Sequence, residues 1–288
     1  MKPIINFIGA GNLGTTIAKL FVLKNTATIQ SVCNTSVNSG QCAVDFITQG
    51  SVCDHIKNLP PADITFITTS DDQIEHCCNL LSQSKQLQNN SMIVHCSGVL
   101  TSDILNSAKN KGCFVASVHP MKSFANATLG VVSFQNTYCA LEGDKEAVAV
   151  IESLFKTIGA NIYQIKADKK VTYHAAGVFA SNYLVTIFQE SLDCLQQAGV
   201  ADAVAKNVVI DLMRSTLNNI SQTDSLKEAL TGPIKRGDVE TVQKHVDALS
   251  DDALYRVLGL KTVDIAGLSE MVKVRLSKVL LKKKKDVA

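Results

Sequence analysis

The sequence predicts an α/β protein in which a mostly parallel, doubly wound sheet is followed by a domain made of helices alone. The chain opens with an apolar run of strand length, Ile4–Ile8, which stops at a glycine-rich turn before a helical pattern begins. Up to about residue 165, runs of strand length alternate with helical patterns, which is typical of a parallel sheet covered on both faces. From Asp168 onward only helical patterns follow. We therefore predict two domains, residues 1–165 and residues 166–288.

The glycine-rich turn at residues 9–14 has the spacing G-x-G-x-x-G between a strand and a helix, the context of a dinucleotide-binding fingerprint. Gly9 permits the tight turn, and Gly11 removes the side chain that would block a pyrophosphate. Gly14 lets the helix lie close to the strand. The phosphates would bind the free N–H groups at the start of the helix. We therefore predict a Rossmann-type domain in which the cofactor contacts include Gly9, Gly11, Asn12, Leu13 and Gly14.

The end of the second predicted strand, Thr28–Asn34, bears on the choice between NAD and NADP. This position faces the adenosine ribose in dinucleotide-binding folds, and an NAD site usually has Asp or Glu there. Here the residues Asn34, Thr35 and Ser36 carry no carboxylate that would repel a 2′-phosphate, so the sequence favours NADP, with NAD as the alternative. Because no arginine precedes Arg214, a lysine or backbone N–H groups would balance the phosphate. A polar loop without cofactor preference is the other interpretation.

The remaining elements of the first domain follow from apolar runs of strand length and from helical periodicity. Residues 69–72 precede one helix and Asp144 another, in positions typical of N-terminal caps. The predicted strands after Thr28–Asn34 are Ser51–Asp54, Ile64–Thr68, Met92–Cys96, Cys113–Val118, Tyr138–Leu141 and Asn161–Gln164. The predicted helices are Leu13–Leu23, Val37–Ile47, Gln73–Leu81, Ser102–Lys109 and Lys145–Ile158.

Polar residues follow several of these strands. Because the carboxyl ends of parallel strands meet at one edge of a sheet, where ligands bind, we expect these residues to line one crevice with the glycine turn. The additional cofactor contacts predicted there are Thr68, Thr69, Ser70 and Ser97. His119, which follows a strand and precedes a proline, is either functional or shapes the wall of the crevice.

A long helix is predicted from about Asp168 to Gly199. Its segment Val171–Gln189 has no charged residue but too many polar ones for a membrane span, so we predict a helix buried on most sides. His174, Val178 and Asn182 are spaced by four and would lie within about 80° of arc on an α-helix. His174 and Asn182 either satisfy each other and nearby backbone, or face the nicotinamide end of the crevice.

Further helices are predicted over about Asp202–Asn218, Ser225–Leu230, Val239–Leu249, Asp252–Leu258 and Ser269–Leu281. The turn-rich link before residue 239 contains Arg236, which could hold a substrate carboxylate or form a surface ion pair, and Asp238, a plausible helix cap. The basic C-terminus places Val272, Leu276, Val279 and Leu280 on one helical face. We interpret it as a packed last helix with a solvated lysine tail rather than a membrane contact.

Composition narrows the class of protein. With 46% hydrophobic and 19% charged residues and a net charge of +2, the 288-residue chain has no electrostatic signature of a nucleic-acid-binding protein. The nine cysteines show no C-x-x-C spacing, and Cys33, Cys96 and Cys139 lie in apolar runs. They therefore predict core residues of a cytoplasmic protein and no metal site. No signal peptide is expected before the first strand.

The sequence resembles a family of two-domain NADP oxidoreductases that join a Rossmann-like domain to a helical C-terminal domain of unknown function. These proteins are related to pyrroline-5-carboxylate reductase, deazaflavin-dependent NADP reductases and β-hydroxyacid dehydrogenases. The matching stretches are IGAGNLG at 8–14, HCSGVL at 95–100, SVHPMKSF at 117–124, YHAAGVFASNYL at 173–184 and LTGPIKRGD at 230–238. The resemblance implies a helical domain like that of 6-phosphogluconate dehydrogenase, which would form a homodimer, and a catalytic cleft between the domains.

The resemblance also implies site residues. In β-hydroxyacid dehydrogenases and ketopantoate reductases the matching long helix carries K-x-x-x-N, with the lysine as acid or base and the asparagine placing the substrate. Asn182 fits that asparagine, but Val178 occupies the lysine position, so His174 or His119 would have to act as proton donor. Ser97, Lys122 and Arg236 are the expected substrate contacts.

Two functions follow from these features. The first is an NADP-dependent oxidoreductase that passes hydride between the nicotinamide and a small C=O or C=N substrate, with a histidine of ordinary pKa as proton donor. The second is a dinucleotide-binding sensor or scaffold without catalysis.

Overall fold

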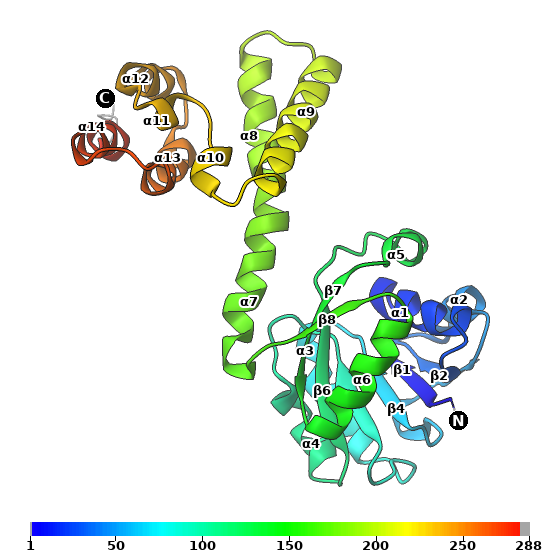
Figure 1. Cartoon of the computed structure of the whole chain (residues 1–288). Coiled ribbons are helices and arrows are strands. Elements are labelled where there is room, and N and C mark those ends of the chain that lie inside the picture. The colour runs from blue at the N-terminus through cyan, green and yellow to red at the C-terminus, as the bar shows by residue number, and fades with distance from the viewer. Residues whose placement is uncertain (1, 283–288) are drawn as a thin grey trace, which may run out of the picture. The chain divides into compact units, whose positions relative to one another are not determined.

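The computed structural model of the chain describes residues 2–282, and their contacts divide them into two compact units (Figure 1). The first unit ends at Ser181 and the second begins at Asn182. The last strand ends at Gln164, and the segment that follows it belongs to the first unit because it contacts the sheet. The domain boundary between residues 165 and 166 stays a prediction.

The first unit is built on one eight-stranded sheet in the order β3-β2-β1-β4-β5-β6-β7-β8. The strands up to β6 pair in parallel, β7 is antiparallel to β6, and β8 is parallel to β7. The sheet is therefore mostly parallel, as the sequence predicted. The order of its first six strands is that of dinucleotide-binding folds, and it reverses direction between β1 and β4 beside the glycine turn. The strands are β1 (Ile4–Ile8), β2 (Thr28–Cys33), β3 (Ser51–Val52), β4 (Ile64–Ile67), β5 (Met92–His95), β6 (Phe114–Pro120), β7 (Tyr138–Gly143) and β8 (Asn161–Gln164).

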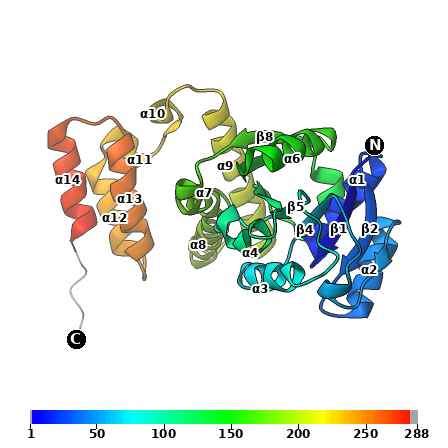
Figure 2. The same cartoon turned by 90° about the horizontal axis from the view of Figure 1, so that it is seen from below.

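Side chains alternate between the two faces of the sheet along each strand, and an apolar core lies on each face. Phe7 and Phe66 lie in the core under α1 (Asn12–Leu23), α2 (Val37–Ile47) and α6 (Lys145–Thr157). Their neighbours Ile8 and Ile67 lie in the core under α3 (Asp71–Ser82) and α4 (Asn106–Lys109). Figure 2 shows α3 and α4 on the opposite side of the sheet from α6. The predicted doubly wound arrangement is confirmed.

Shorter helices complete the first unit. These are the 3-10 turns Ile56–Asn58, Ser102–Leu105 and Ala167–Lys169, and α5 (Ala127–Ser133). Two predicted helix caps lie at the expected positions, but their side chains do not make the expected cap hydrogen bonds. Ser70 and Asp144 precede α3 and α6 without a side-chain cap hydrogen bond. The Asp144 carboxylate instead accepts from the Val115 N–H at 2.9 Å.

The predicted long helix is three consecutive segments. α7 (Lys170–Gly177) leads into a π-helical turn, Val178–Asn182, and then into α8 (Tyr183–Gln197). Because the π turn changes the angular step per residue, the 80° arc expected for residues 174, 178 and 182 does not apply. The predicted burial is also wrong, since no residue of Val171–Gln189 is buried and Val185 is 70% exposed.

The second unit is helical throughout its described residues. α8 and α9 (Asp202–Ser221) run side by side as an antiparallel pair (Figure 1), and a second cluster packs around Ile234, Val242, Val263, Leu276 and Leu280. Asp238 caps α12, accepting from the Thr241 N–H at 3.0 Å, as predicted. The remaining helices are α10 (Leu226–Ala229), α11 (Pro233–Arg236), α12 (Val239–Ala248), α13 (Ala253–Ile265) and α14 (Glu270–Leu281).

The predicted apolar face of the last helix is confirmed, because Leu276 and Leu280 are buried and Val272 and Val279 pack beside them. Of the lysine tail, residues 283–285 lie outside the described part of the chain. Within residues 2–282, no helix has both the length and the apolar composition needed to cross a bilayer.

Candidate functional site

The glycine turn adopts the geometry that its spacing predicted. Gly9 has φ of +80°, and a Cβ at this position would lie 2.9 Å from the Thr69 backbone nitrogen. Gly14 packs against the side chain of Thr68, which follows β4, and a Cβ there would lie 3.2 Å from the Thr68 Cβ. Gly9 and Gly14 therefore permit close contact with the loop after β4, a neighbour in space rather than in sequence.

Gly11 serves a different purpose, because a Cβ built on it would meet nothing within 4 Å. It is exposed and stands at the N-cap of α1, where no side chain caps the helix and no acidic residue occupies the first turn. The N–H groups at the start of a helix have no partner within the helix and carry the positive end of its dipole. The surface over Gly11 can therefore receive an anionic group such as a pyrophosphate.

Two of the predicted cofactor contacts hold the loop in place through their side chains. Asn34 accepts from the Ala10 N–H at 2.7 Å, and Asn12 donates to the carbonyls of Phe124 and Ala125. Ser36 caps α2 by accepting from the Ser39 N–H, while Thr35 is exposed beside it. A ribose phosphate at the end of β2 would thus meet hydroxyl groups and the start of α2, which has no acidic residue in its first turn.

Ser97 follows β5 and organises the next turn. Its hydroxyl donates to Asp71 Oδ2 at 2.8 Å and accepts from the N–H groups of Val99 and Leu100. With 5% of its surface exposed, Ser97 acts on the shape of the loop. A direct contact of this hydroxyl with cofactor or substrate stays a prediction, as do the predicted contacts of Thr68, Thr69 and Ser70.

His119, Tyr173 and His174 form an aromatic cluster against Gly98, which we call the histidine cluster. His119 Nδ1 lies 2.9 Å from the Tyr173 hydroxyl, and the rings of His119 and His174 have centroids 5.9 Å apart. A Cβ on Gly98 would lie 2.8 Å from His119 Nε2 and would also collide with His174. The two histidines predicted as catalytic are therefore brought together within the first unit. His119 lies inside β6 rather than after it, because pairing with β7 extends that strand to Pro120.

The environment sets the protonation of this cluster. Burial lowers the pKa of His119 to about 4, with further lowering by electrostatic interaction with His174 and with Lys170. His119 is then neutral near pH 7, which corrects the expectation of an ordinary pKa for this one of the two candidate proton donors. Burial also raises the pKa of Tyr173, so its hydroxyl stays protonated and can donate to Nδ1. The ring proton of His119 then remains on Nε2.

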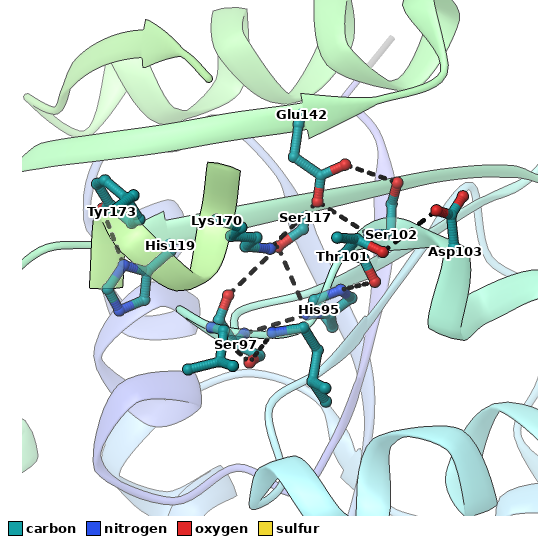
Figure 3. Close-up of polar contacts among 12 residues, drawn as sticks. His95, Ser97, Thr101, Ser102, Asp103, Ser117, His119, Glu142, Lys170 and Tyr173 are labelled. Atoms are coloured by element: carbon teal, nitrogen blue, oxygen red, sulfur yellow. Dashed lines mark hydrogen bonds and ion pairs between the residues drawn. The ribbon is translucent and has the colours of Figure 1, made fainter. Parts of the chain in front are cut away.

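Beneath this cluster lies a buried ionic network that the sequence did not predict (Figure 3). Lys170, at the start of α7, is 1% exposed, and its ammonium donates to Ser117 Oγ and to Glu142 Oε1. Glu142 also accepts from the backbone N–H and the hydroxyl of Ser102, at 2.9 and 2.8 Å. Burial lowers the pKa of Lys170, while the charge of Glu142 opposes that shift. Two sequence features point to this pair in retrospect. Glu142 is the only charged residue in the otherwise apolar segment 139–142, and Lys170 precedes His174 by four residues.

His95, at the end of β5, joins this network through Ser117, whose Oγ lies 3.5 Å from His95 Nδ1. Its Nδ1 accepts from the Ser97 N–H at 3.1 Å, so Nε2 carries the proton and donates to the Thr101 carbonyl at 3.1 Å. His95 is fully buried, and burial together with the charge of Lys170 lowers its pKa to about 3. It is therefore a neutral structural residue that fixes the loop after β5.

The other predicted site residues lie elsewhere. Lys122 is half-buried just after β6, where its N–H bonds to the Pro120 carbonyl. Asn182 and Arg236 belong to the second unit, which is described separately from the first. Their roles toward substrate stay predictions.

The fold and the glycine turn together define the class of protein. The first unit has the Rossmann-type architecture of dinucleotide-binding proteins, and a helical unit follows it. Residues 137–262, which are less than half of the chain, match the family described as Domain of unknown function (DUF2520). This part of the chain is therefore similar to the DUF2520 family. The match confirms the resemblance to proteins that join a Rossmann-like domain to a helical domain of unknown function.

Solved structures share this architecture over nearly the whole chain, although no curated protein matches the sequence. A provisionally assigned NADP oxidoreductase from Bacteroides fragilis is 20% identical with a TM-score of 0.73, over 93% of this chain and 99% of that one. The Thermotoga maritima protein TM1727 is 24% identical with a TM-score of 0.70, over 96% and 98%. Plasmodium falciparum pyrroline carboxylate reductase, solved with NADP bound, is 15% identical with a TM-score of 0.62, over 96% and 98%. At these identities the likeness establishes the fold.

Proposed function

We propose that this protein is an NADP-dependent oxidoreductase that acts on a small C=N or C=O substrate. The observation that carries the proposal is the uncapped start of α1 behind Gly11, at the point where the strand order reverses. Exposed N–H groups, an open surface and a helix dipole there fit the pyrophosphate of a dinucleotide. The bound nicotinamide would supply the hydride chemistry, and the similar folds of an NADP-bound reductase and of other oxidoreductases support the class.

The end of β2 favours NADP over NAD. Thr35 and Ser36 offer hydroxyl groups, and the 11-residue helix α2 begins there without an acidic residue in its first turn. A 2′-phosphate at this position would gain hydrogen bonds and the positive end of a dipole, and no carboxylate would repel it.

His119 favours a C=N substrate over a ketone. A ketone needs a proton for the developing alkoxide, and neutral His119 can only polarise it through the Nε2 proton. A protonated imine already carries that proton and needs placement alone. We assign His119 the placement of the reacting nitrogen or oxygen, with His174 beside it. Asn182, Lys122 and Arg236 are proposed to hold the rest of the substrate, Arg236 through a carboxylate, and the interdomain location of that site is part of the proposal.

Calorimetric titration of the purified chain with NADPH and NADH tests the cofactor. We expect NADPH to bind at least about tenfold more tightly than NADH, because the hydrogen bonds of a 2′-phosphate are charge-assisted. Binding of neither nucleotide would overturn the proposal. NADPH binding without oxidation across a panel of cyclic imines, ketoacids and deazaflavins would instead favour a dinucleotide sensor.

The helical unit is proposed to form a homodimer. Val204, Val208 and Leu212 are spaced by four on α9, which places them on one face, and they are 54%, 38% and 64% exposed. Val185 on the neighbouring helix α8 is 70% exposed. Monomeric proteins rarely leave contiguous apolar surface of this kind uncovered, and a second copy would cover it.

Light scattering after gel filtration tests the dimer. We expect the wild-type chain, of 30.9 kDa, to elute at twice that mass and Leu212→Glu to elute as a monomer. Val132→Glu alters an even more exposed apolar residue of the first unit, on α5, and should leave the mass unchanged. A monomeric wild-type chain would contradict this part of the proposal.

A further inference from the structure

Lys170 is a buried cation that the proposed chemistry does not use. It follows Lys169, which is exposed and pairs with Asp168, yet Lys170 itself turns inward and is 1% exposed. Its ammonium is enclosed by Ser117 and Glu142, both of which are buried as well. A lysine enclosed in this way does not reach a substrate, so its role has to be exerted through neighbouring residues.

The contacts of Lys170 and those of the histidine cluster join the same two elements. Ser117 and His119 are two residues apart on β6, so their side chains point to the same side of the strand. Lys170 and Tyr173 are three residues apart on α7, so they lie on neighbouring turns of the same helix face. The pairs Lys170–Ser117 and Tyr173–His119 are therefore successive cross-links between α7 and β6 (Figure 3).

The contact between Lys170 and Ser117 is supported by further buried hydrogen bonds through Glu142. Glu142 lies opposite Ser117 in the pairing of β6 with β7, and both of its oxygens are occupied, one of them by Lys170 and Ser102 together. A buried ion pair whose lone pairs are satisfied favours one geometry over alternatives. The start of α7 is thus fixed against two strands of the sheet, one turn before the residues that contact His119.

We propose that Lys170 is a positioning residue, which fixes α7 against β6 so that Tyr173 and His174 meet His119 and Gly98. The proposal rests on the proposed function only in naming the histidine cluster as the place where substrate binds. The ammonium also holds a positive charge beside the cluster, which contributes to the low pKa of His119. The other titratable groups that face His119 are Tyr173 and His174 from α7 and His95 from β5.

Nuclear magnetic resonance titration of the imidazole signals tests the proposal without cofactor or substrate. In Lys170→Met we expect the titration midpoint of His119 to move upward toward its ordinary value, because a nearby positive charge has been removed and the cluster loosened. We also expect the ring signals of Tyr173 and His174 to shift. Lys109→Met removes an ion pair at the surface, with Asp144 at 2.5 Å, and should leave all three residues unchanged.

A second variant keeps the test valid if Lys170→Met does not fold. Lys170→Met combined with Glu142→Gln removes both charges and should fold, because neither partner is left buried and unpaired. It still lacks the contact with Ser117, so the signals of Tyr173 and His174 should shift in it as well. Unchanged signals of these residues in a folded variant would overturn the positioning role. NADPH titration of the same variants separates this outcome from a failure of the proposed function.

Discussion

Lowering the pH from 7.5 to 5.0 should destabilise the fold of the first unit, with His95 alone accounting for about 2 kcal/mol. In the folded chain the pKa of His95 is about 3, and in the unfolded chain it is about 6.5. Between these values the unfolded state binds the additional proton, so the stabilisation is complete above about pH 6.5 and is lost as the pH falls. At pH 5 the difference is about 1.5 pKa units, and each unit corresponds to about 1.4 kcal/mol. His119 acts in the same direction.

Urea denaturation at several pH values, followed by circular dichroism, measures the effect, and His95→Asn isolates the contribution of His95. The asparagine oxygen can accept from the Ser97 N–H as Nδ1 does, but the side chain does not titrate. The variant is expected to be less stable at pH 7.5 and to lose about 2 kcal/mol less on acidification than the wild-type chain. His76→Asn, at an exposed position on α3, should keep the full loss. An unaltered pH dependence in His95→Asn would show that His95 is not held neutral in the folded state.

The sequence was sufficient for the features that depend on local signals. The glycine turn, the strand Ile4–Ile8 and the helix Val37–Ile47 are marked by spacing and periodicity within a dozen residues. Cys33, Cys96 and Cys139 are free and buried in the described structure, as their apolar neighbours indicated. The carboxyl ends of β4 and β5 could be placed beside the glycine turn because parallel strands allow few arrangements.

The features that escaped prediction depend on side-chain direction and on distant partners. Lys170 follows two other lysines within five residues, so its sequence neighbourhood is that of a solvated segment. Only the pairing of β7 with β6 places Glu142 where it can neutralise the ammonium. The exposure of Val171–Gln189 escaped prediction as well, because an uncharged segment alone does not show whether the rest of the chain packs against it. The π turn at Val178–Asn182 changed the helix phase in the same segment without a sequence signal that we could identify.

Substituting Gly11 with alanine should weaken NADPH binding by about tenfold or more while leaving the fold intact. The substitution fits the free protein, because Gly11 has φ of −79° and a Cβ there meets nothing within 4 Å. The new methyl group would occupy the surface where the pyrophosphate must approach the start of α1. A loss of one charge-assisted hydrogen bond costs about 1.5–3 kcal/mol, and 1.4 kcal/mol corresponds to a factor of ten in Kd.

Gly9→Ala provides the contrasting variant. Its backbone has φ of +80°, and its Cβ would lie 2.9 Å from the Thr69 nitrogen, so the cost should fall on folding and lower Tm. Calorimetry with NADPH and thermal denaturation of both variants would separate the two effects. A Gly11→Ala chain that binds NADPH as tightly as the wild-type chain would show that the phosphates do not lie over this turn. The cofactor would then have to be held elsewhere, because the surface over Gly11 is what allows an anion to reach the uncapped start of α1.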